Sequence, residues 1–200
     1  MNFSLKGFFY QVLIDPILSK LHESIISNID KSQRVIDIAC GTGSLSLAVA
    51  EKALHVTGID LSKEIIGTAN RSAAKRNAKN VKFEYQDASD LSCFKNNEFD
   101  IAMTSMAIHQ FDADLAIRIM LEMKRISSTI IIVDYNYPMP KGSSRSIAYG
   151  IEWLAGGDHY RNFRKYMKKG GLHTFLNESG LTIKSEIIRG NGVFVIVVCG

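Results

Sequence analysis

The sequence predicts a doubly wound α/β fold with a seven-stranded sheet that is mostly parallel and ends in an antiparallel hairpin. Strand-like runs alternate with helical patterns five times along the chain, and this alternation is typical of a parallel sheet with right-handed crossovers. Two further strand-like runs, residues 181–188 and 193–198, flank Asn191-Gly192. Because that dipeptide favours the tight turn of a β-hairpin, we expect the C-terminal strands to be antiparallel.

The elements of the five-strand core follow in order. Apolar or alternating runs predict strands at residues 34–39, 55–60, 81–85, 99–104 and 129–133. The last run is almost purely apolar, which indicates a strand buried on both faces. Apolar residues at helical spacing predict helices over residues 43–52, after Ser62 and after Asp112, the latter two acting as N-caps. An opening helix begins at Asp15-Pro16 and forms an N-terminal helical cap over residues 1–29.

The pattern changes after the fifth strand. Residues 135–157 are rich in proline and glycine, so we expect a loop with one helix around residues 147–154. The helical pattern resumes at His159 and breaks at Gly170-Gly171. We therefore predict one domain over the whole chain, with residues 135–170 inserted as a lid.

Composition fits that single domain and limits its setting. The chain has 200 residues, of which 46% are hydrophobic, and a net charge of +4 that does not by itself indicate nucleic acid. Cys40, Cys93 and Cys199 are widely spaced and form no metal-ligand cluster, so we expect a reducing cytoplasm and no metal. No apolar run reaches membrane-spanning length, and no signal peptide is convincing.

The turn after the first strand carries the central motif, which runs from Asp37 to Gly43. Gly41 and Gly43 allow a sharp turn and a close backbone approach to a ligand, and the following helix presents free N–H groups. Asp60 ends the second strand 19 residues beyond Gly41, the distance at which an acid binds ribose hydroxyls.

Two features of the same turn disfavour a phosphate ligand. Ser46 replaces the third glycine of the dinucleotide fingerprint, and the carboxylate of Asp37 would repel a pyrophosphate. No Gly-Lys-Ser/Thr follows, which excludes a P-loop. A ligand with an ammonium group and a ribose but no phosphate is favoured, and S-adenosylmethionine has this chemistry.

Four motifs in the correct order resemble those of class I S-adenosylmethionine-dependent methyltransferases. They are Asp37-x-Ala39-x-Gly41-x-Gly43, Gly58-Ile-Asp60-Leu-Ser62, Gln86-Asp87-Ala88 and Phe99–His109. Ala39 stands where glycine is more usual. The resemblance covers residues 30–135 and implies a Rossmann-like sheet, S-adenosylmethionine as cofactor, and a cofactor site formed by Asp37, Ala39, Cys40, Gly41, Gly43, Asp60, Leu61, Asp87, Ala88 and Ser105. Local context alone also allows other roles for two of these residues. Asp87 can be only a turn residue, and Cys40 is better explained as a small buried filler than as a nucleophile.

Substrate contacts are expected outside the five-strand core. Aromatic and histidine side chains in the N-terminal segment and the lid are candidates: Tyr10, Tyr137, Trp153, His159 and Tyr160. They predict a lid over an apolar pocket, although packing of the lid onto the sheet explains them equally well. They give a loose similarity to methyltransferases that act on quinone-like or other small metabolites.

Methyl transfer from a sulfonium is an in-line displacement, in which alignment and desolvation are the protein's main contributions. His109 follows the fourth strand and is our candidate general base or substrate anchor; a structural turn residue is the alternative.

Three functions therefore remain open: a small-molecule methyltransferase, an RNA methyltransferase that uses the basic run at residues 161–169, and a non-catalytic cofactor-binding module. The lid aromatics favour the first. The end of the fourth strand lacks the Asp/Asn-Pro-Pro-aromatic motif of enzymes that methylate nucleobase amino groups, which makes nucleic acid a less favoured partner without excluding RNA. The basic run is otherwise interpreted as a solvated helix face. The sequence makes no prediction of oligomeric state.

Overall fold

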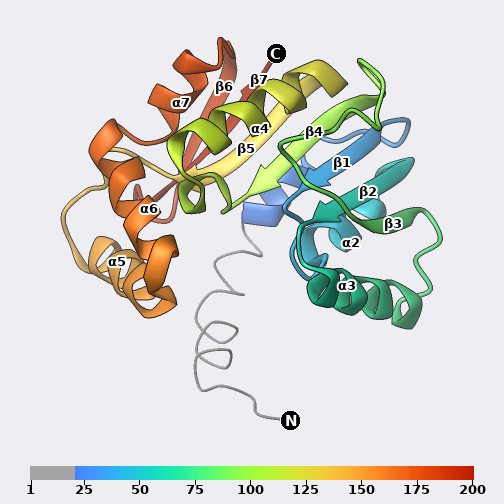
Figure 1. Cartoon of the computed structure of the whole chain (residues 1–200), viewed down its shortest axis with the longest axis horizontal. Coiled ribbons are helices and arrows are strands. Elements are labelled where there is room, and N and C mark those ends of the chain that lie inside the picture. The colour runs from blue at the N-terminus through green and yellow to red at the C-terminus, as the bar shows by residue number, and fades with distance from the viewer. Residues whose placement is uncertain (1–20) are drawn as a thin grey trace.

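The computed structural model describes residues 21–200 and places a seven-stranded sheet between layers of helices (Figure 1). The strands are β1 (Arg34–Ile38), β2 (His55–Asp60), β3 (Val81–Tyr85), β4 (Phe99–Ser105), β5 (Ser127–Tyr135), β6 (Ile183–Arg189) and β7 (Phe194–Cys199). The helices are α2 (Ser44–Ala50), α3 (Lys63–Lys75), the 3-10 turn η1 (Ile108–Gln110), α4 (Ala113–Ile126), α5 (Ser143–Ala155), α6 (Gly157–Lys169) and α7 (Leu172–Glu178).

The strand order is β3-β2-β1-β4-β5-β7-β6. The first five strands are parallel, and β7 runs antiparallel to both β5 and β6. This confirms the predicted doubly wound sheet and its C-terminal hairpin. Asn191 and Gly192 both adopt positive φ in the hairpin turn, as the dipeptide predicts.

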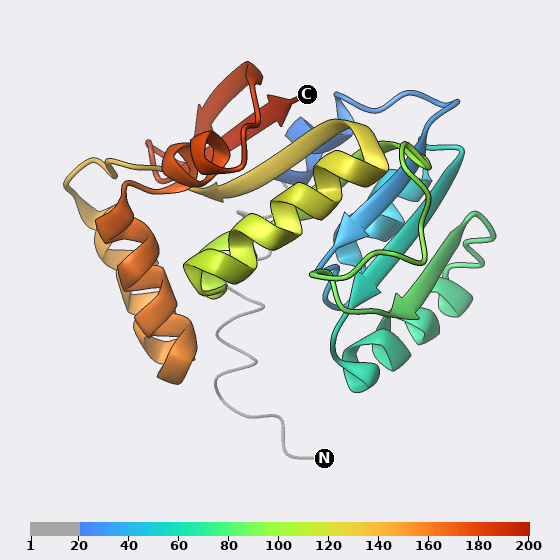
Figure 2. The same cartoon turned by 45° about the horizontal axis from the view of Figure 1, so that its top comes forward.

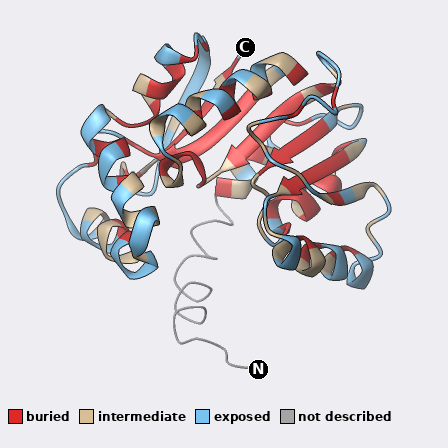
Figure 3. Cartoon of the chain, viewed as in Figure 1, coloured by how far each residue is buried: buried red, intermediate tan, exposed pale blue. Residues whose placement is uncertain are grey.

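Helices cover both faces of the sheet, and the strands between them are largely buried (Figure 3). On one face, Ile36 and Ile38 of β1 share a core with Ile119 and Met123 of α4. On the other face, α2 packs on β1 together with residues 21–26, which are helical. The burial of β5 on both sides explains its almost purely apolar sequence.

The helix caps predicted at Ser62 and Asp112 are confirmed. Ser62 accepts a hydrogen bond from the N–H of Ile65, and Asp112 accepts one from the N–H of Leu115. The opening helix expected from Asp15-Pro16 lies largely outside the described residues. None of the helices in residues 21–200 is long and apolar enough to span a membrane.

The predicted lid is more helical than its composition suggested. Residues 143–155 form α5, a 13-residue helix where we expected a loop with one shorter helix around residues 147–154. Residues 157–169 form α6, which confirms the helical pattern predicted from His159 to the break at Gly170-Gly171. Gly142 and Gly156, both at positive φ, act as the boundaries of α5, so the glycines delimit helices here and do not mark a continuous loop. Figures 1 and 2 show α5 and α6 together at one end of the sheet, with α3 at the other end.

Candidate active site

The candidate cofactor site lies where the strand order reverses. β1 pairs with β2 on one side and with β4 on the other. The loop that follows β1 leads to α2 on one face of the sheet, whereas the loop that follows β4 leads to α4 on the other face. Such a switch point is where doubly wound sheets bind ligands. The turn after β1 and the acid at the end of β2 meet at this edge.

Asp60 closes the turn after β1. Its carboxylate accepts hydrogen bonds from the N–H of Gly41 at 3.0 Å and from the N–H of Ser62 at 3.0 Å, one on each oxygen. These two contacts fix the carboxylate at the mouth of the site, where it stays partly exposed. Each oxygen keeps further acceptor capacity for the hydroxyls of a ribose.

The two glycines of the turn have different surroundings. Gly41 has φ +55°, and a Cβ built on it would meet nothing within 4 Å, so open space lies in front of its backbone. Gly43 has φ +78°, and its Cβ would lie 2.4 Å from Cζ of Phe83. Gly41 alone is thus placed to let a ligand approach. Gly43, which we had expected to do the same, instead makes room for the β3 side chain.

Asp37 is buried at the carboxyl end of β1. The hydroxyl of Ser46 donates a hydrogen bond to its Oδ2 at 2.5 Å. Burial raises the pKa of Asp37 to about 7; the Ser46 hydrogen bond lowers it and the nearby charge of Asp60 raises it further. Ser46, which we read only as a missing glycine, is therefore the partner of the buried acid.

These residues fit S-adenosylmethionine. A carboxylate at ribose-binding spacing, a glycine with open space before it, and a buried acid that a nearby ammonium would ionise match the nucleoside and amino-acid ends of that cofactor. The same buried acid disfavours a phosphate.

The remaining predicted cofactor residues divide by environment. Leu61 is exposed beside Asp60, and Ser105 ends β4 at the same edge of the sheet. Oδ1 of Asp87 accepts hydrogen bonds from both the N–H and the hydroxyl of Ser89, as its turn role predicts. Ala88 packs against the core.

Ala39 and Cys40 belong to the turn itself. Ala39 adopts a left-handed φ of 57°, the conformation for which glycine is more usual. Cys40 donates its N–H to the carbonyl of Ile59. Burial, with the charges of Asp37 and Asp60, raises the pKa of its thiol, which favours the filler role over that of a nucleophile.

His109 lies in a second, buried cluster beyond the end of β4. Only 1% of it is exposed. Its Nδ1 lies 2.6 Å from Oδ1 of Asp134, and its backbone N–H donates to Oδ2 of the same carboxylate at 3.1 Å. Asp134, at the end of β5, thus fixes both the ring and the backbone of His109.

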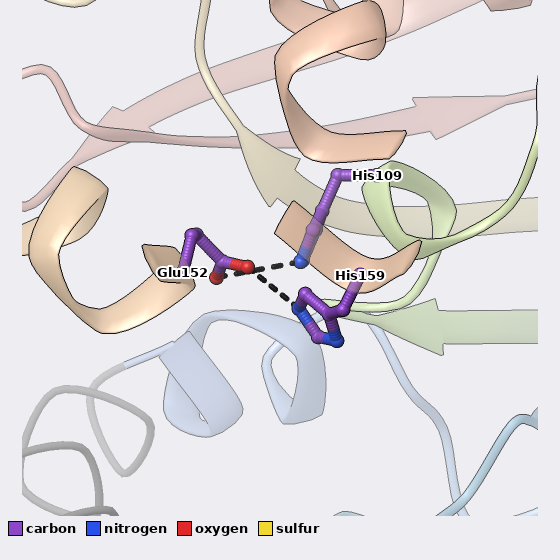
Figure 4. A group of neighbouring side chains, drawn as sticks. All are labelled: His109, Glu152 and His159. Carbon is purple, nitrogen blue, oxygen red and sulfur yellow. Dashed lines mark ion pairs between the residues drawn. The ribbon is translucent and has the colours of Figure 1, made fainter. Parts of the chain in front are cut away.

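Glu152 of α5 approaches His109 from the other side (Figure 4). Its Oε1 lies 3.5 Å from Nε2 of His109, and its Oε2 lies 2.6 Å from Nε2 of His159 on α6. The hydroxyl of Tyr135 donates to Oε1 at 2.7 Å. Burial lowers the pKa of His109, but the Asp134 and Glu152 carboxylates outweigh burial and raise that pKa to about 9. An imidazole held protonated in this way is an anchor or a structural group and a poor general base.

The other predicted substrate residues lie elsewhere. Trp153 is 65% exposed on α5. Tyr137 and Tyr160 line a groove of about 660 Å³ together with Tyr149, Arg161, Arg164, Lys165, Met167 and Lys168. Among the predicted substrate residues within 21–200, His109 and His159 thus share the buried cluster, and Tyr137 and Tyr160 share the groove. Tyr10 lies outside the described part of the chain.

Comparisons with known proteins agree with this geometry. A family model described as a methyltransferase domain matches residues 29–179. A ubiquinone biosynthesis O-methyltransferase of Rhizobium leguminosarum bv. trifolii is 30% identical over 164 residues, or 80% of this chain and 62% of that protein. The chain spans less than two thirds of the length of the first curated relatives that it matches.

Solved structures show the same fold. An S-adenosylmethionine-dependent methyltransferase from Aquifex aeolicus superposes with a TM-score of 0.61 at 20% identity, covering 89% of this chain and 88% of that one. Magnesium protoporphyrin IX methyltransferase from Synechocystis, solved with S-adenosylhomocysteine, superposes with a TM-score of 0.61 at 20% identity, and the alignment covers 100% of this chain and 87% of that one.

The fold and the family model together define a methyltransferase domain built on a Rossmann-like sheet, and its cofactor edge fits S-adenosylmethionine. The chain belongs to the methyltransferase domain family over residues 29–179.

Proposed function

We propose that this domain transfers the methyl group of S-adenosylmethionine to a small-molecule acceptor bound beside α5 and α6. The observation that carries the proposal is the position of these helices. α6 packs on η1, directly after β4, so the lid stands next to the edge that holds the cofactor motifs. A lid in this position can shield the reacting groups from water.

The surface of α5 supports an apolar acceptor. Ile147, Trp153 and Leu154 are each more than half exposed on this one helix. Exposed apolar side chains gathered in this way mark a binding surface more often than scattered ones do. Relatives named as ubiquinone biosynthesis O-methyltransferases support a small, quinone-like acceptor.

When bound, S-adenosylmethionine supplies an activated methyl group, and the chain supplies position and charge. Asp60 would hold the ribose, the Gly41 backbone would lie against the ligand, and Asp37 would balance the ammonium group. Alignment and exclusion of water then provide most of the rate enhancement.

One observation favours a second candidate, an RNA acceptor. Arg161, Arg164, Lys165 and Lys168 line one groove with three tyrosines, and cations interleaved with aromatic rings suit a nucleic acid. A strong loss of activity between 50 and 200 mM salt would favour this reading, because phosphate contacts release counterions.

The test is transfer of a labelled methyl group into a cell extract fractionated into small molecules, RNA and protein. We expect label in the small-molecule fraction. Asp60→Asn should weaken cofactor binding roughly 10- to 100-fold, the scale of a lost charge-assisted hydrogen bond. The matched control is Asp100→Asn, which alters an acid at the start of β4 that accepts the N–H of Arg34 at the opposite edge of the sheet. Label in RNA alone, or equal effects of the two variants, would contradict the proposal.

A further inference from the structure

We propose that His109, Glu152 and His159 form a binding site for one divalent transition-metal ion of the zinc class. The three side chains come from η1, α5 and α6, and no sequence spacing relates them. Their candidate ligand atoms all lie within 4.8 Å of one another. The site is distinct from the cofactor turn at Asp60 and Gly41.

The distances suit a tetrahedral ion after small side-chain adjustments. Zinc lies about 2.0–2.2 Å from nitrogen and carboxylate ligands, which puts two tetrahedral ligands roughly 3.3 Å apart. Oε1 of Glu152 lies 3.5 Å from Nε2 of His109, and Oε2 of the same carboxylate lies 2.6 Å from Nε2 of His159. Two imidazoles and one carboxylate are the ligand types that zinc-class ions prefer.

Asp134 gives His109 the arrangement of a metal ligand. Its contact with Nδ1 at 2.6 Å fixes the ring, so that Nε2 points into the cluster (Figure 4). This buried Nε2 makes no hydrogen bond within the described part of the chain. Histidines that bind metals commonly donate their other ring N–H to a carboxylate, which fixes the tautomer and raises ligand basicity.

Tyr135 prepares Glu152 in the same way. Its hydroxyl donates to Oε1, so Oε2, on the His159 side, is the oxygen best placed to bind an ion. Asp134 and Glu152 are both buried, at 0% and 4% exposure. A divalent cation would place more positive charge between these two buried carboxylates than a single protonated imidazole does.

A metal here would tie the lid to the sheet. Glu152 and His159 belong to the two lid helices, whereas His109 follows β4 in the core of the domain. Three protein ligands also leave a fourth position open for water or for an oxygen of a bound molecule. Metal binding is therefore expected to order α5 and α6 against η1.

The experiment uses the full chain after removal of any affinity tag and treatment with EDTA. Titration with Co²⁺ should give visible absorption that saturates at one equivalent, and Zn²⁺ should displace it. Glu152→Gln and His159→Gln should each weaken Zn²⁺ binding by roughly 100-fold, at least the scale seen when groups around a metal ligand are lost. His173→Gln is the matched control, because His173 also lies 2.6 Å from a glutamate, Glu186, but on the surface.

A second readout protects the test against misfolding. His159 is partly exposed, so His159→Gln should fold, and circular dichroism checks this. Zn²⁺ should raise the melting temperature of wild type and of His173→Gln but leave that of His159→Gln unchanged. Absence of saturable binding to wild type, or equal Zn²⁺ affinity of wild type and a folded His159→Gln, would overturn the proposal. Neither readout depends on methyl transfer, so failure of the proposed function would be distinguishable.

Discussion

Cofactor affinity should rise with pH through the titration of Asp37. The pKa of this buried acid is raised to about 7, so at pH 5.5 nearly all of it is protonated in the free protein. The ammonium group of the cofactor favours the carboxylate. Binding should therefore release a proton, and affinity should increase until Asp37 is ionised before binding.

The magnitude follows from the fraction of Asp37 that is ionised. With a pKa of about 7, that fraction rises from about 3% at pH 5.5 to about 50% at pH 7, which predicts a roughly 16-fold gain in affinity. An α-amino group titrates at about 7.7–8.0, above this window, so the ligand keeps its charge. The folding stability of the ligand-free protein should depend on pH in the opposite direction. The raised pKa of Asp37 contributes stability at pH values below its ordinary pKa of 3.8, and this contribution is lost as the pH rises through 7.

Calorimetric titration of S-adenosylhomocysteine at pH 5.5, 6.25 and 7, in buffers of different ionisation enthalpy, measures both the affinity and the protons released. Asp37→Asn keeps the shape of the side chain and should abolish the slope. A flat profile in wild type, or the same slope in Asp37→Asn, would refute the electrostatic role of this acid.

Three other predictions follow from the structure. Gly41→Ala should bind the cofactor at least tenfold more weakly, yet lose only about 1–2 kcal/mol of stability because of its left-handed φ. Gly43→Ala should in addition clash with Phe83 and unfold at a lower urea concentration. Calorimetry of cofactor binding and urea melts distinguish the two variants, and equal behaviour of both would contradict the assignment. His109→Asn removes the cation between two buried carboxylates, so its unfolding free energy should fall by roughly 3–5 kcal/mol, and an unchanged urea midpoint would show that the cluster is not ionic. Within residues 135–169, hydrogen exchange should be faster in α5 than in α6 and should slow on addition of cofactor and acceptor; uniformly slow exchange in both states would make the segment a rigid part of the core.

The cofactor edge could be predicted because its residues follow from local rules. Asp37 and Asp60 end adjacent parallel strands, and Gly41 lies in the turn between β1 and α2, so their spacing along the chain implies their proximity in space. The different role of Gly43 could not be predicted, because it depends on Phe83. That side chain reaches the turn from β3 and lies 40 residues after Gly43 in the sequence.

The buried cluster was only partly predictable for the same reason. His109 and His159 stood out as titratable residues near a strand end and in the lid, but Glu152 lies in a helix whose sequence looks amphipathic and ordinary. Its burial is set by the packing of α5 against Tyr135 and α6, which no local pattern encodes. Asp134 follows the apolar run at residues 129–133, and no motif in the sequence singles it out. Its contact with His109 joins β5 to η1 across 25 residues.

The proposed lid should not move as one unit, because its two helices are held differently. α6 buries Phe163 and Tyr166 completely, and exposing two such side chains would cost about 3–6 kcal/mol. α5 buries only Ala148 and Glu152 among its own residues. On the proposed function, an acceptor would therefore enter most easily by displacement of α5. The contacts of Glu152 with Tyr135, His109 and His159 are among the interactions that resist this displacement. If the segment acts as a lid, the positive charge that faces Glu152, whether a proton on a histidine or a bound cation, should consequently influence how readily α5 moves away.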